Sequence, residues 1–189
     1  TWEINRLLAW FSSLASNEIP KEKFTAQVSL PSDTEVRVTR SFHAPRTLVW
    51  QAHTDPKLAR QWLIGYPGWT MPVCEMDVRV GGTYRWRWRQ DSDGAEFGFF
   101  GTYDEVSEPE ELSYDQIYDP DGFSSAMPTD NKCAIRSTYT EKNGITTLVT
   151  VMDFGTKEAR DAAVSTGMTD GMEFNYQTLD KMFAERQGG

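Results

Sequence analysis

The sequence predicts an α+β domain in which a curved antiparallel sheet of about six to seven strands wraps around one long C-terminal helix. Two observations lead to this fold class: residues 73–154 hold a series of short alternating segments, and residues 168–186 carry a single helical stripe. Short segments of period two, separated by turn residues, are typical of antiparallel strands. A helix laid across the concave face of a bent sheet buries the apolar surfaces of both elements.

The chain opens with a predicted amphipathic helix at residues 1–16, whose apolar face comprises Ile4, Leu7, Leu8, Phe11 and Leu14. A polar stretch with two prolines follows, to about residue 32. We therefore divide the chain into an N-terminal helix and linker, 1–32, and a folded domain, 33–189. The helix is expected to pack back on the domain, and a homodimer contact through this helix is the second interpretation.

Glu35–Phe42 alternates between apolar and polar residues and is predicted to be a half-buried strand. Two short helices follow it. Pro45 occupies the first-turn position of one, and the pair Asp55-Pro56 starts the other, which ends near Trp62.

Six further strands are predicted: Val73–Val78, Thr83–Arg89, Phe97–Val106, Leu112–Tyr118, Lys132–Glu141 and Ile145–Phe154. Asn143-Gly144 joins the last two as a hairpin. The sharpest alternation lies in the second strand, where Tyr84, Trp86 and Trp88 share one face and three arginines share the other. Thr156 is expected to cap a short helix that runs through Val164.

The final stretch has its apolar residues mostly three or four positions apart, on one helical face: Met168, Met172, Tyr176, Leu179, Met182 and Phe183. Thr169 and Asp170 are candidates to cap its start, and Gly188 follows its end. Methionine and aromatic side chains are large and deformable. The stripe therefore closes an ordinary core, which is the more frequent case, or forms one wall of a pocket for apolar ligands.

The net charge of −9 excludes whole classes of partner. Residues 90–131 contain twelve acids and no Lys or Arg, whereas Arg79, Arg85, Arg87 and Arg89 precede them. We expect these arginines to pair with acids on neighbouring strands. Nucleic acids and anionic membranes both require a basic surface, so neither is an expected partner.

No apolar run approaches the length of a membrane span. The two cysteines, Cys74 and Cys133, lack metal-ligand spacing. They are interpreted as free buried thiols in a reducing cytoplasm, with a single disulfide as the alternative. No signal-peptide pattern opens the sequence, and we expect a cytoplasmic protein.

Several local runs resemble the START-like superfamily, which has the helix-grip fold, and within it the family named after the activator of the heat-shock chaperone ATPase. The matching runs extend over residues 34–186 and include Arg40-Ser-Phe-His-Ala-Pro45, Thr54-Asp-Pro56, Gly81-Gly-Thr-Tyr84, Gly101-Thr-Tyr-Asp-Glu-Val106 and Gly167-Met-Thr-Asp-Gly171. The resemblance implies a hydrophobic cavity between the sheet and the last helix. Met172 stands where the family often has Trp, which implies a roomier cavity wall.

The resemblance implies ligand-binding residues on both walls of that cavity. These are Tyr84, Trp86, Trp88, Met172, Tyr176 and Phe183, with Trp62, Trp69 and Met76 near the mouth and Tyr103, Tyr114 and Arg40 as orienting polar groups. A packed aromatic core without a cavity is the alternative. Arg40 lies on the apolar phase of its strand, so we expect it to be paired structurally, or to hold an anionic ligand group.

Catalytic chemistry has weak support. The two histidines, His43 and His53, show no metal or triad spacing, and a structural role is favoured for both. No metal and no cofactor are expected. We predict a protein that binds a small hydrophobic molecule, aromatic, lipid or polyketide-like. An enzyme of cyclase or hydrolase type that uses the same cavity ranks below it, as does a co-chaperone-like interaction module.

Overall fold

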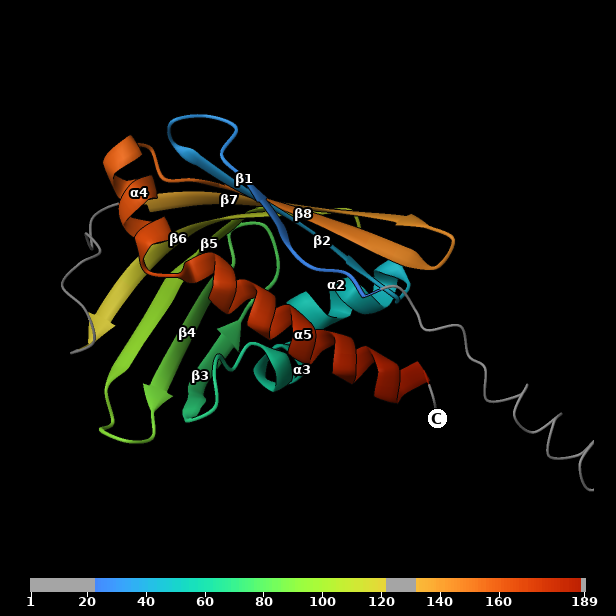
Figure 1. Cartoon of the computed structure of the whole chain (residues 1–189), viewed down its shortest axis with the longest axis horizontal. Helices are drawn as coiled ribbons and strands as arrows, with labels where there is room; N and C mark the ends of the chain where they lie inside the picture. The colour runs from blue at the N-terminus through green and yellow to red at the C-terminus, as the bar shows by residue number, and fades with distance from the viewer. Residues whose placement is uncertain (1–22, 122–131, 188–189) are drawn as a thin grey trace, which may run out of the picture.

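The described residues form one antiparallel sheet of eight strands, in the order β1-β2-β8-β7-β6-β5-β4-β3 (Figure 1). This computed structural model describes residues 23–121 and 132–187. The strands are β1 (Gln27–Ser29), β2 (Glu35–Phe42), β3 (Trp69–Met76), β4 (Thr83–Gln90), β5 (Glu96–Ser107), β6 (Glu111–Asp121), β7 (Lys132–Lys142) and β8 (Ile145–Asp153).

The predicted count of six to seven strands is too low, because the sheet also contains the short edge strand β1. Its three residues pair with β2 between Gln27↔Thr39 and Ser29↔Arg37. All three are exposed, so the segment has no apolar alternation to reveal it. It lies within the stretch that we expected to be linker. The remaining strands occur in the predicted order, although β3 begins at Trp69 rather than Val73.

Four helices lie against this sheet: α2 (Arg46–Thr54), α3 (Pro56–Trp62), α4 (Lys157–Ser165) and α5 (Met168–Gln187). The starts of α3 and α4 follow the predicted chemistry, whereas Pro45 lies just before α2 as its N-cap and not in its first turn. The Asp55 side chain accepts from the Lys57 amide at the start of α3, and the Thr156 hydroxyl accepts from the Ala159 amide at the start of α4. Gly167, rather than Thr169 or Asp170, precedes α5, and its carbonyl accepts the first helical bonds.

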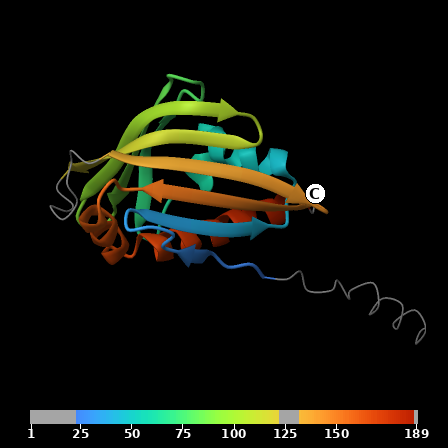
Figure 2. The ribbon, with the colours of Figure 1, turned by 90° about the horizontal axis from the view of Figure 1, so that it is seen from above.

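The sheet curves so that α2, α3 and α5 lie on its concave side, as Figures 1 and 2 show. The main core fills this space, with fully buried Val36, Phe42, Val49, Leu148 and Leu179. A smaller cluster of Ala59, Met71, Cys74 and Trp88 lies under α3. Leu63, Met76, Trp86 and Phe99 contact both clusters and join them.

Two further expectations concern the described part of the chain. Cys74 and Cys133 are both free and buried, as predicted. Within residues 23–121 and 132–187, no helix has the length and apolar character needed to cross a membrane. The predicted helix at 1–16, and with it the homodimer contact, lies outside the described residues.

Candidate functional site

Five tyrosines from four strands and one helix meet in the main core, and we call them the tyrosine cluster: Tyr84, Tyr103, Tyr114, Tyr139 and Tyr176. Three of their rings contact one another directly. The ring centroids of Tyr84 and Tyr103 are 5.5 Å apart, and those of Tyr84 and Tyr114 are 5.3 Å apart. Register explains part of this arrangement, because Tyr103 and Tyr114 are directly paired across β5 and β6.

The hydroxyls of the cluster influence one another. Burial raises the pKa of Tyr139 well above its usual value, and the neighbouring Tyr114, Tyr176 and Tyr103 raise it further. Burial likewise raises the pKa of Tyr176 to about 12, although a hydrogen bond from the Thr150 hydroxyl to the phenol oxygen lowers it. The phenols are therefore neutral, and each presents an O–H group as donor and an oxygen as acceptor.

Two of these hydroxyls have no hydrogen-bond partner among the described residues. Tyr103 and Tyr139 are each only 1% exposed, and the hydroxyl oxygens of both are buried without a partner. By contrast, the Tyr84 hydroxyl donates to the Asp115 carbonyl at 3.0 Å. Buried polar atoms are nearly always hydrogen-bonded, so two unpartnered hydroxyls in one cluster require an explanation.

The same region holds two more unpartnered atoms, Trp86 Nε1 and His53 Nε2. The Trp86 ring lies 6.2 Å from that of Tyr114, and the His53 ring lies 5.5 Å from that of Tyr139. Both residues therefore border the tyrosine cluster. Among the other buried indoles near it, Trp62 is satisfied, because its Nε1 donates to the Ala52 carbonyl at 2.8 Å.

The protonation of His53 follows from its contacts. Nδ1 lies 2.8 Å from the Val49 carbonyl oxygen, and a carbonyl only accepts, so Nδ1 carries the proton. Burial lowers the pKa of the imidazole from 6.5 to about 4, although the Val49 bond opposes this shift. Near neutral pH the ring is thus uncharged, and Nε2 presents a lone pair.

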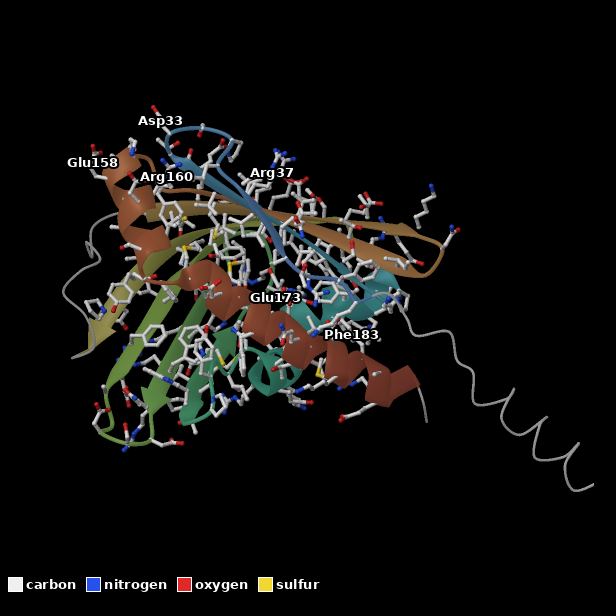
Figure 3. The ribbon with its side chains drawn as sticks, in the orientation of Figure 1. Asp33, Arg37, Glu158, Arg160, Glu173 and Phe183 are labelled. Carbon is white, nitrogen blue, oxygen red and sulfur yellow. The ribbon has the colours of Figure 1, made fainter. Side chains whose placement is uncertain are left out.

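Arg40 is fully buried on the concave side of β2 and is paired, as the first of our two alternatives predicted. Its Nε lies 3.1 Å from Glu173 Oε2, and its Nη2 lies 2.5 Å from Asp180 Oδ2. Both carboxylates belong to α5. Figure 3 labels Glu173 near the middle of that helix, with Phe183 farther toward its C-terminus. This ion pair fixes α5 to the sheet.

Most of the predicted ligand-binding residues meet in this interior. Tyr84, Trp86, Tyr103 and Tyr114 form a continuous set of ring contacts. On the helical side, Tyr176 stacks with Trp62 at 6.2 Å, and Met172 packs against the main core. Trp86 and Tyr114 are only partly buried, as is Met172, so this part of the core extends toward solvent.

Other predicted residues lie apart from the cluster. Trp88 and Trp69 contact Phe97 within the smaller core, with Met76 between the two cores. Phe183 packs on Phe42 at 5.8 Å, in the fully buried part of the interior.

Sequence reasoning missed Tyr139 and assigned His53 a structural role. Tyr139 occupies the buried phase of β7, with Cys133 and Ile135, and that alternation was the available signal. His53 follows Val49 by one helical turn, so it faces the same side of α2 as that buried residue. Neither pattern reveals that a polar atom of the side chain lacks a partner.

The outer face of the sheet has a shallow groove of about 570 Å³, lined by residues that include Arg85, Phe100, Asp115, Asp119 and Lys132. Its charges are paired across strands, as predicted for Arg85 and Arg87, whereas Arg79 pairs with Asp77, two residues before it. Arg85 lies 3.6 Å from Asp119, and Lys132 contacts Asp115. Arg87, on the same face, is buried between Glu96 and Asp119. This pairing explains how Arg85 and Arg87 of β4 are accommodated.

A metal centre has no donor set in the described parts of the chain. Within them, no three His, Cys, Asp or Glu side chains gather closely enough to hold an ion. The unpartnered polar groups of the described interior are two neutral hydroxyls, one indole and one imidazole.

The fold and this interior define an α+β protein of the helix-grip type, and comparison with known proteins places it in a family. Residues 43–184 match the family described as activator of Hsp90 ATPase homolog 1-like protein, and the chain belongs to that family. No curated protein matches the chain.

Several solved structures resemble it. A protein from Rhodobacter sphaeroides is 30% identical, with a TM-score of 0.76, over 85% of this chain and 99% of that one. Protein Ms6760 from Mycobacterium smegmatis is 24% identical, with a TM-score of 0.73, over 87% of this chain and 99% of that one. An AHSA1-like protein from Aeromonas hydrophila is 20% identical, with a TM-score of 0.55, over 76% and 93%. The last two likenesses concern the fold alone.

Proposed function

We propose that the protein binds a small hydrophobic molecule, aromatic, lipid or polyketide-like, between the concave face of the sheet and the first half of α5. One observation carries the proposal: four buried polar atoms without partners border a single aromatic region. Leaving such atoms unpaired costs about 1–3 kcal/mol each. A ligand that supplies their partners would recover this free energy on binding.

The surroundings of these atoms favour a ligand with a large apolar surface. Trp86, Tyr114 and Met172 are partly buried walls, and methionine adapts its shape to different ligands. On α5, a Cβ atom added at Gly171 would meet no atom within 4 Å apart from its chain neighbours and the helix backbone. Apolar walls with a few convergent polar groups are the usual composition of small-molecule sites.

A bulky side chain in the proposed wall provides the test. The variant Met172→Trp fills space beside the core, whereas Lys181→Trp adds the same indole to an exposed position of the same helix. We expect the neutral dye Nile red to bind the unmodified protein, with a rise in dye fluorescence and in melting temperature. Met172→Trp is expected to weaken this binding about tenfold or more, which corresponds to about 1.4 kcal/mol.

The control separates occupancy of the site from a general effect of tryptophan. Lys181→Trp should bind the dye like the unmodified protein. A panel extended to flavones, long-chain alcohols and polycyclic ketones covers the three ligand classes. If no member of the panel binds, or if both variants bind equally well, the proposed site is wrong.

A further inference from the structure

The buried positive charges among the described residues already have acidic partners. Three arginines are nearly inaccessible to solvent: Arg40, Arg87 and Arg160. Arg40 has two carboxylate partners on α5, Arg87 lies between Glu96 and Asp119, and Arg160 pairs with Asp161 and donates to the Ser32 carbonyl. An anionic group in the interior would thus compete with existing carboxylates for each of these cations.

The side chains that carry the unpartnered atoms add no charge. The phenols are neutral because burial raises the pKa of Tyr103, Tyr114 and Tyr139. His53 is neutral for the reason given above. Moving an ionised carboxylate from water into such surroundings is costly, because neither a counter-charge nor a set of charged donors replaces its hydration.

The unpartnered atoms nevertheless specify hydrogen bonds of two kinds. Trp86 Nε1 only donates, whereas His53 Nε2 only accepts in the tautomer fixed by Val49. The hydroxyls of Tyr103 and Tyr139 can do either. A molecule that satisfies this set must offer at least one O–H or N–H donor and at least one oxygen acceptor. A pure hydrocarbon offers neither.

We propose that the ligand is uncharged and hydroxylated, with one hydroxyl that donates to His53 Nε2 and one or more oxygens that accept from Tyr103, Tyr139 or Trp86. This inference rests on the proposed function and narrows it. Neutral phenols and alcohols, including hydroxylated polyketide-like aromatics, fit the description. Fatty-acid anions, aromatic carboxylates and phosphates do not.

Three probes with one carbon skeleton test the chemistry in the unmodified protein: naphthol, naphthoate and naphthalene. Isothermal titration calorimetry at neutral pH compares the affinities of the three probes: naphthol is neutral and hydroxylated, naphthoate is anionic, and naphthalene is apolar. We expect naphthol to bind about tenfold or more tightly than each of the others, since it alone satisfies the polar atoms without adding charge.

The two histidines provide a matched pair of variants. His53→Phe is expected to weaken naphthol binding toward that of naphthalene, because the acceptor for its hydroxyl is lost, and to leave naphthalene binding intact. His43→Phe, a change at a ring that stacks on Phe24, should alter neither affinity. The comparison of the three probes needs no variant, so it remains decisive if His53→Phe fails to fold.

The outcomes separate the two proposals. Naphthoate binding as tightly as naphthol would overturn the neutral, hydroxylated ligand class and leave the interior binding site standing. Naphthalene binding as tightly as naphthol would overturn the role of the polar atoms. If none of the probes binds, while Nile red does, the ligand class is wrong. If nothing binds at all, the proposed function fails first.

Discussion

The two halves of α5 are attached to the rest of the molecule by different forces. In the second half, Leu179 and Phe183 are almost completely buried, and Met182 is 8% exposed. In the first half, none of residues 168–175 is buried. There Met168 and Met172 pack on the core with part of their surface exposed, and polar contacts add to this attachment: Glu173 accepts from Arg40 and from the Ala26 amide, and Asn175 accepts from the Gly65 amide.

This difference has a functional consequence. Fully buried apolar packing is lost steeply when elements separate, whereas partly exposed contacts are exchanged for water at a smaller net cost. We therefore expect the first half of α5 to move away from the sheet more easily than the second, because Asp180 in the second half still pairs with Arg40 when Glu173 leaves. It is also the half that carries Met172 and Gly171, beside the proposed ligand. A helix anchored at one end and loosely held at the other suits a site that must admit a ligand.

The largest expected effect tests the anchored half. Leu179→Ala should lower the free energy of unfolding by about 4 kcal/mol, because Leu179 has no exposed surface and its removal leaves a cavity. Met172→Ala should cost about 1 kcal/mol, because that side chain is partly exposed. Urea denaturation of both variants measures the difference. Equal losses would show that the two halves are equally well packed.

A smaller effect depends on pH. The pKa of His53 is about 4 in the folded protein and 6.5 when the chain is unfolded. Between these values the unfolded state binds a proton that the folded state does not. Stability is therefore lost as pH falls from 6.5 toward 4, by up to about 3 kcal/mol. Urea midpoints measured across this window should fall steeply for the unmodified protein.

Variants of the two histidines, measured over the same pH range, test whether His53 causes this loss of stability. The variant His53→Phe should show a clearly flatter dependence on pH, and His43→Phe should retain the slope of the unmodified protein. A slope that survives in His53→Phe would mean that other groups cause it and that the imidazole is not held neutral. Such a result would also remove the acceptor role assigned to Nε2.

A substitution at Glu173 should loosen the first half of α5 and leave the second half in place. Glu173→Gln should cost about 2 kcal/mol, because hydrogen bonds to a buried guanidinium and to the Ala26 amide are weakened. Hydrogen exchange should become faster in residues 168–175 and change little in 176–186. Glu185→Gln, at an exposed site of the same helix, is the control. Uniformly faster exchange along α5 would contradict the proposed division of the helix.

The sequence is informative about these elements to different degrees. Strand β2 has the predicted bounds, Glu35–Phe42, because its alternation is regular and one face is buried. The position of Arg40 on the apolar phase correctly indicated a buried, paired charge. Its partners could not be predicted, because Glu173 and Asp180 are 133 and 140 residues away in sequence, and only the tertiary fold brings them to β2.

The candidate site is predictable in its walls but not in its polar atoms. The alternation in β4 places Tyr84, Trp86 and Trp88 on the concave side, as expected. Whether a tyrosine hydroxyl finds a partner depends on neighbours from other strands and helices. Tyr84 and Tyr103 have similar patterns in sequence, yet only Tyr84 reaches a carbonyl. Hydrogen-bond satisfaction is a property of the assembled interior.

The smallest expected effect is an increase in the free energy of unfolding, whereas most substitutions in a core decrease it. Tyr139→Phe removes a hydroxyl that is buried without a partner and keeps the ring that packs on Trp50 and His53. We expect the ligand-free protein to gain about 1 kcal/mol in stability, because the cost of burying an unsatisfied hydroxyl disappears. The exposed Tyr66→Phe should change stability by less than about 0.5 kcal/mol.

Ligand binding should respond to Tyr139→Phe in the other direction. A neutral hydroxylated probe such as naphthol is expected to bind the variant about tenfold more weakly, since one of its hydrogen-bond partners is lost. A variant that is more stable but binds the ligand more weakly would show that the Tyr139 hydroxyl serves ligand binding and lowers the stability of the ligand-free fold. A variant that is less stable than the unmodified protein would show that the hydroxyl is satisfied within the native interior. The unpartnered atoms would then no longer identify a binding site.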